Sequence, residues 1–108
     1  MKIKRWGGGW AAVVLSIGAA QAQLPVDRQT LQTRSLAASC AACHGTDGRA
    51  IDGATVPGLA GLPAIYLAEQ MRGFKSGARS ATVMQQIAKG FDDPQIEQLA
   101  AYFAGLPK

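Results

Sequence analysis

The sequence contains few of the residues from which zinc, thiol-redox and disulfide-rich sites are built. It has two cysteines and a single histidine in 108 residues. A zinc site needs four protein ligands, or three and a water, so here it would also require a carboxylate or a partner chain. A redox-active dithiol of the thioredoxin kind requires a strand–helix context, and no convincing strand pattern is present.

Positive charge and apolar runs are concentrated at the N-terminus. Residues 1–22 have the pattern of a signal peptide: a basic start with Lys2, Lys4 and Arg5, an apolar run over 11–20, and an A-x-A site ending at Ala22. An uncleaved membrane anchor is the alternative, but the run is shorter than the span of about 20 residues that a bilayer requires. We therefore predict cleavage after Ala22 and export to the periplasm.

The predicted mature chain is short and nearly neutral. It has 108 − 22 = 86 residues, and losing three basic side chains lowers the formal net charge from +4 to +1. No polybasic patch remains to bind nucleic acid, and no apolar stretch remains to span a membrane. A chain of this length buries only about 60% of its unfolded surface, so a large apolar cofactor would contribute to its folding.

The segment Cys40-Ala41-Ala42-Cys43-His44 predicts which cofactor that is. Two cysteines three residues apart, followed at once by a histidine, form the attachment pattern of a c-type haem. Positions i and i+3 of a helical turn share one face, so both thiols can bond to one porphyrin edge while His44 reaches the iron. A disulfide between Cys40 and Cys43 is the remaining alternative, but so short a bridge on a helix would be strained.

The second axial ligand is predicted to be a methionine, because the mature chain has no other histidine. Met71 lies on an apolar helical stripe, where a methionine is more often part of the core. Met84 follows a turn rich in glycine and serine, at the start of a short helix. We therefore predict His44 and Met84 as the iron ligands. A core position for Met84, or an iron with an open site, remains the alternative.

Apolar periodicity and capping residues predict an all-α fold of about four helices. Thr30 and Asp93 are the predicted caps of the first and last helices, and Pro63 is the predicted first residue of the second. The predicted helices run from residue 30 into the cysteine motif, from 63 to 76, from 81 to 89, and from 94, with Pro94 as first residue, to 104. Residues 45–61 are loop-like, and a loop this long in a compact domain is usually functional.

With these residues in place, residues 36–106 resemble the class I c-type cytochromes. Among them they look most like the cytochrome subunit of flavocytochrome c sulfide dehydrogenases and related small periplasmic bacterial cytochromes c. The segments that carry the resemblance are Cys40–Gly45, Pro57–Gly61, Tyr66–Met71, Phe74–Gly77, Ala81–Met84, Ile87–Gly90 and Leu99–Phe103.

The resemblance implies the class I cytochrome c fold, with about four helices packed around one covalently attached haem c. It divides the chain into a signal peptide (1–22), a lead-in with the start of the first helix (23–35) and one cytochrome c domain (36–108). It further implies these roles: thioether bonds at Cys40 and Cys43, and iron ligation by His44 and Met84.

Three further site residues follow from the resemblance. Pro57 matches a position whose carbonyl accepts a hydrogen bond from the ligand histidine. Leu59 matches a residue that packs on the ring. Arg79 occupies a place where a basic group meets a haem propionate, although an ordinary surface arginine fits it equally well.

The function implied is that of a non-catalytic, periplasmic one-electron carrier. Its expected donor is a flavoprotein sulfide dehydrogenase subunit. The alternative is a shuttle between a quinol-oxidising complex and a terminal oxidase or another reductase. Relatives of the sulfide-oxidising type often carry two haem motifs in one chain, whereas this sequence has one.

Overall fold

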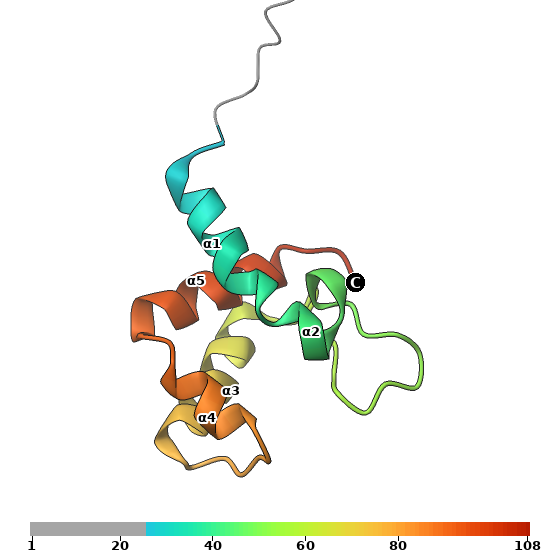
Figure 1. Cartoon of the computed structure of the whole chain (residues 1–108), viewed down its shortest axis with the longest axis vertical. Helices are drawn as coiled ribbons and strands as arrows, with labels where there is room; N and C mark the ends of the chain where they lie inside the picture. Colours follow the sequence, from blue (N-terminus) through green and yellow to red (C-terminus); the bar gives the residue numbers. More distant parts are fainter. Residues whose placement is uncertain (1–25) are drawn as a thin grey trace, which may run out of the picture.

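The protein is described by a computed structural model that covers residues 26–108. The predicted signal peptide, residues 1–22, lies outside the described residues. The elements are α1 (Arg28–Ala38), α2 (Ala41–His44), the 3-10 turn η1 (Thr46–Gly48), α3 (Ala64–Ser76), α4 (Met84–Lys89) and α5 (Asp93–Ala104) (Figure 1). Residues 26–108 contain no strand, so the predicted all-α class is confirmed. There are five α-helices rather than about four.

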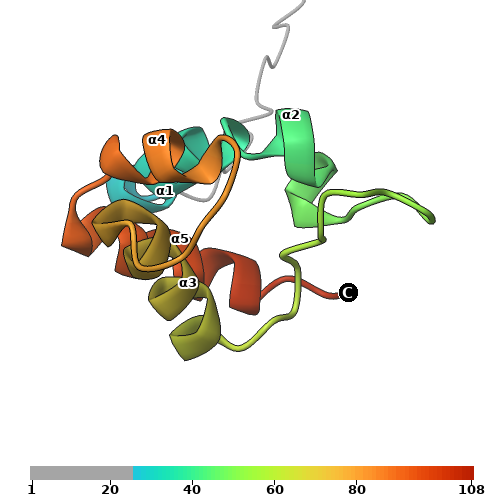
Figure 2. The ribbon, with the colours of Figure 1, turned by 90° about the horizontal axis from the view of Figure 1, so that it is seen from below.

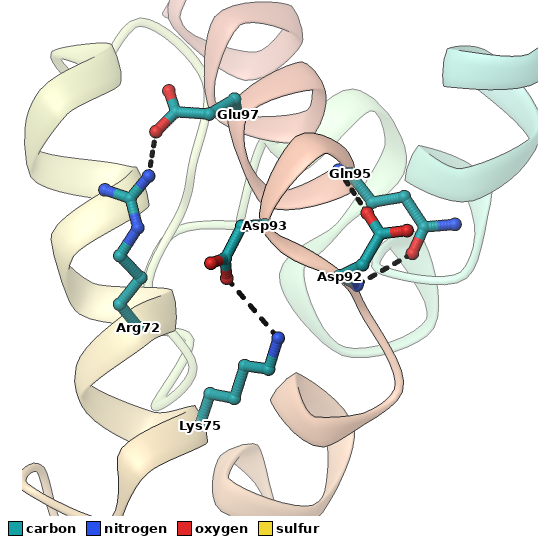
Figure 3. A network of polar contacts seen from close by, with 6 residues as sticks. All are labelled: Arg72, Lys75, Asp92, Asp93, Gln95 and Glu97. Atoms are coloured by element: carbon teal, nitrogen blue, oxygen red, sulfur yellow. Dashed lines mark hydrogen bonds and ion pairs between the residues drawn. The ribbon is translucent and has the colours of Figure 1, made fainter.

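The predicted N-caps of the first and last helices, Thr30 and Asp93, both lie later in the sequence than the observed ones. Asp27, not Thr30, caps α1: its carboxylate accepts the Thr30 hydroxyl at 2.7 Å and the Thr30 N–H at 2.9 Å. Both hydrogen bonds lower the pKa of Asp27, and the bond from the Thr30 hydroxyl has the larger effect. Asp92, not Asp93, caps α5 in a reciprocal capping box with Gln95 (Figure 3). An N-cap side chain must reach the N–H of the third helical residue. Asp27 does so in α1 and Asp92 does so in α5.

The first helix stops before the cysteine motif instead of running into it. The Ser39 hydroxyl donates to the Leu36 carbonyl at 2.7 Å, a local bond that competes with continuation of the helix. α2 is therefore a separate turn that carries the motif. α4 also begins later than predicted, at Met84 rather than Ala81, and Pro63 is the N-cap of α3 rather than its first residue.

α5 is the central element of the core. Its apolar stripe, Ile96, Leu99, Ala100 and Phe103, is buried at the predicted helical spacing. It packs against Ala37 of α1 and against Leu67 and Ala68 of α3. Figures 1 and 2 show α5 lying between these two helices.

Two exposed ion pairs, Arg72–Glu97 and Lys75–Asp93, also join α3 to α5 (Figure 3). Such surface pairs contribute only about 0–1 kcal/mol each. The apolar contact between α3 and α5 therefore provides most of the stabilisation between these helices.

Gly48 is the point at which the long loop is fixed to this core. Its carbonyl accepts hydrogen bonds from the N–H groups of Leu59 at 2.7 Å and Ala60 at 3.1 Å. Its φ is +71°, and a Cβ placed there would lie 2.8 Å from Cδ1 of Phe103. The loop therefore returns to the core through a position where only glycine fits.

We expect Gly48→Ala to lower the free energy of unfolding of the haem-loaded protein by about 2–5 kcal/mol. A left-handed alanine costs about 1–2 kcal/mol, and overpacking against Phe103 adds about 1–3 kcal/mol. Gly53→Ala is the matched control, because Gly53 also has a positive φ of +77° but has no atom within 4 Å of the added Cβ. Denaturant titration of both variants measures the difference. Equal losses would show that Phe103 does not restrict position 48.

Candidate functional site

His44, the last residue of α2, is the one polar side chain that is buried among residues 26–108, with 9% of its surface exposed. Its Nδ1 lies 2.6 Å from the carbonyl oxygen of Pro57. Because a carbonyl only accepts hydrogen bonds, Nδ1 must carry the proton. The unprotonated Nε2 is then the atom that can bind a metal.

A cavity of about 470 Å³ opens beside this histidine. Its wall comes from α2, the following loop, α3, α4 and α5, and Figure 2 shows how these elements are arranged. Much of the wall is apolar, including Leu67, Met71, Leu99 and Phe103. The structure places all seven predicted site residues on this wall: Cys40, Cys43, His44, Pro57, Leu59, Arg79 and Met84.

The two cysteines are free thiols, Cys40 half-buried and Cys43 exposed. Burial raises the pKa of the Cys40 thiol, against a smaller lowering by its hydrogen bond with Ser39. In redox-active Cys-x-x-Cys motifs the cysteine pKa is instead lowered. The described residues also bring together no group of three or more His, Cys, Asp and Glu side chains suited to a metal ion. The geometry therefore favours neither the dithiol nor the zinc alternative.

Both candidate methionines line the cavity, but their surroundings differ. Met71 of α3 also packs against the buried core cluster. Met84 begins α4 directly after an irregular segment and is not among the side chains packed against that cluster. Figure 2 shows α4 and α2 on different sides of the space between the helices. The core contact gives Met71 a packing role, so Met84 remains the predicted ligand.

Arg79 reaches the cavity wall from the segment between α3 and α4. Its guanidinium lies 4.6 Å from the ring centre of Phe74 and donates a hydrogen bond to the side chain of Gln70. Tyr66, Gln70 and Phe74 also line the cavity, although none of them was predicted as a site residue from the sequence. Their spacing of four along α3 is the signal that places them on one helical face.

A sequence model of the family described as Cytochrome c matches residues 32–107. The chain belongs to the cytochrome c family. It is 49% identical over 70 residues to the thiosulfate dehydrogenase electron acceptor of Thiomonas intermedia (strain K12), a match covering 65% of this chain and 32% of the relative. It is 40% identical over 73 residues to the cytochrome subunit of sulfide dehydrogenase of Chlorobaculum tepidum, covering 68% of this chain and 64% of the relative.

The crystal structure of reduced recombinant cytochrome c4 from Pseudomonas stutzeri has the same fold. It superposes with a TM-score of 0.59 at 33% identity, over 63% of this chain and 38% of the solved one. The chain therefore spans about a third to two-thirds of the length of these relatives. The class I cytochrome c fold predicted from the sequence is confirmed.

The cavity fits one haem c. It combines an apolar wall, two thiols three residues apart at its edge, and a buried imidazole with a free Nε2. A methionine thioether on the same wall supplies a soft second donor of the kind that haem iron accepts. Residues 32–107 thus form a cytochrome c domain whose cavity fits a single haem c.

We expect Met84→Ala to abolish the sulfur-to-iron charge-transfer absorption of the oxidised protein and to lower its reduction potential, because a thioether ligand raises that potential. The mass should remain that of the chain plus one haem. Met71→Ala, the control, should retain the absorption and lower the free energy of unfolding by about 2 kcal/mol or more. Visible spectroscopy measures the absorption and mass spectrometry the attached haem in both variants. Loss of the absorption in Met71→Ala alone would reverse the assignment.

Proposed function

We propose that this cytochrome is a periplasmic carrier that accepts single electrons from a dehydrogenase of reduced inorganic sulfur compounds. A flavoprotein sulfide dehydrogenase is the first candidate donor. The observation that carries the proposal is the apolar cavity with His44 fixed by Pro57, in a chain whose relatives are named for sulfide and thiosulfate dehydrogenases. Residues 1–22 act in this proposal as a cleaved export signal, which leaves one cytochrome domain.

The chain's own residues prepare the site for electron transfer without bond-making chemistry. A haem c supplies an iron that alternates between the ferrous and ferric states. The Pro57 carbonyl holds the His44 ring in one tautomer and orientation. Met84 on the cavity wall provides the second donor proposed here, so that no coordination position is left for a substrate. Leu59 and the apolar wall offer a surface on which the ring can pack.

Three exposed, uncharged side chains define the proposed docking face. Tyr66, Val83 and Ile87 line the cavity and are nevertheless 45%, 56% and 43% exposed. Large apolar side chains left in solvent at the mouth of a site indicate contact with another protein. The predicted mature chain has a formal net charge near zero, so long-range electrostatic steering contributes little to encounter. None of the helices within residues 26–108 is long and apolar enough to cross a membrane.

We expect sulfide to reduce the haem-loaded protein rapidly only when a sulfide dehydrogenase flavoprotein is present, with a rate that changes little between low and high salt. A thiosulfate dehydrogenase with thiosulfate is the parallel experiment. Absorbance of the reduced haem follows both reactions. Rapid reduction by a quinol-oxidising complex, with no reduction by either sulfur dehydrogenase, would instead support the shuttle between such a complex and a terminal oxidase.

Substitutions test the docking face within the same assay. Val83→Asp should slow reduction about tenfold, the effect expected for truncating or charging a central interface residue worth about 1.4 kcal/mol. Ile51→Asp is the matched control, because Ile51 is 81% exposed and lies off the cavity wall. It should leave the rate unchanged. Equal effects of the two substitutions would exclude the face around Val83 as the contact.

A further inference from the structure

Residues 77–83 connect α3 to α4 and lead directly into Met84. They form no helix. Most of them are exposed, including Val83 immediately before the methionine. Irregular, exposed segments with few buried contacts are the parts of a protein that open most readily. Whatever fixes this segment therefore decides how firmly Met84 is held on the cavity wall.

Arg79, in the middle of the segment, is joined to α3 by three contacts. Its main-chain N–H donates to the Gly73 carbonyl at 3.0 Å. Its guanidinium stacks over Phe74 at 4.6 Å and donates to the Gln70 side-chain oxygen. The approach to α3 is close, because a Cβ added at Gly73 would lie 3.3 Å from the Cβ of Arg79.

Gln85 joins the same residue to α4. Its side-chain Nε2 donates to the main-chain carbonyl of Arg79 at 3.2 Å. Gln85 follows Met84 directly and does not line the cavity. Arg79 thus connects the end of one helix to the start of the next. We call Gln70, Phe74, Arg79 and Gln85 together the clasp.

We propose that the clasp fixes residues 77–83 and thereby sets how readily another ligand replaces Met84 at the iron. This inference rests on the ligand role given to Met84 in the proposed function. For the thioether to leave and another ligand to enter, the segment before Met84 must move away from α3. That movement breaks the contacts of Arg79 with Gln70 and Gln85. Arg79 and Gln85 are in this view positioning residues that act through Met84.

Gln85 provides a cleaner test than Arg79. The guanidinium has five N–H donors, so Arg79 can hold Gln70 and also contact a haem propionate, and its removal would change both. Gln85→Ala removes only the bond to the Arg79 carbonyl. Gln86→Ala is the matched control: it is the same residue type in the same helix, it is exposed, and its side chain makes no hydrogen bond among the described residues.

The experiment uses the oxidised, haem-loaded protein and imidazole as the competing ligand. Stopped-flow loss of the sulfur-to-iron charge-transfer absorption measures how fast imidazole replaces the thioether. Gln85→Ala should accelerate replacement about two- to tenfold, the factor that one neutral hydrogen bond supplies. Amide hydrogen exchange in residues 77–83 should rise by a similar factor, while the absorption before imidazole and the attached haem stay as in wild type. Gln86→Ala should match wild type in every measurement.

A second pair of substitutions tests the other end of the clasp. Gln70→Ala removes the acceptor for Arg79 and should also accelerate replacement, whereas Gln70→Glu keeps an oxygen acceptor and should restore a slow rate. If the charge-transfer absorption is present in wild type but Gln85→Ala exchanges no faster than Gln86→Ala, the clasp proposal is wrong. If wild type itself lacks the absorption, the ligand role of Met84 is wrong and the clasp proposal fails with it.

Discussion

The hydrogen bond between His44 and the Pro57 carbonyl is the constraint on which the site depends. It joins residues 13 positions apart at 2.6 Å and is partly buried. A buried polar group without a partner costs about 1–3 kcal/mol, so the imidazole can be buried only where the loop brings Pro57 back to α2. The loop returns because the Gly48 carbonyl, near its start, accepts hydrogen bonds from the N–H groups of Leu59 and Ala60, near its end. Gly48 itself packs on Phe103 of α5. The orientation of His44, the proposed iron ligand, therefore depends in part on the contact between Gly48 and Phe103 of α5, far along the chain.

The core shows why the protein needs its cofactor. Among the described residues, the buried hydrophobic side chains are four large ones, Leu67, Ile96, Leu99 and Phe103, together with five alanines. So small a set gives little stabilisation to a domain of this length. The cavity adds an apolar wall that a flat porphyrin can cover. We therefore expect haem attachment and folding to be coupled, with the ring completing the core and the core holding the proposed ligands in place.

The sequence was most informative where the spacing of the residues is compatible with a single local structure. The cysteine–histidine motif identified the cofactor, and the stripe from Ile96 to Phe103 identified the central helix. Caps were less certain, because two acceptors lie within one turn, as with Asp92 and Asp93, and only the folded geometry selects between them. The break at Ser39 was missed because an alanine-rich stretch also permits a continuous helix. The contacts of Arg79 with Gln70 and Gln85 join α3, the connecting segment and α4 where the chain reverses direction. Helical periodicity relates residues within one helix only, so it could not predict them.

The two sides of the cavity are held by interactions of different strength. On one side, His44 is anchored by a partly buried hydrogen bond and by its position directly after Cys43, a proposed attachment point of the ring. On the other, Met84 depends on a segment fastened by exposed and individually weak contacts. Exposed hydrogen bonds and cation–π contacts contribute only about 1 kcal/mol each. With Met84 as the proposed iron ligand, we expect substitutions on this side to change the strength of iron ligation in small steps while the haem stays attached. The potential of the proposed carrier could then be adjusted to a partner without refolding its site.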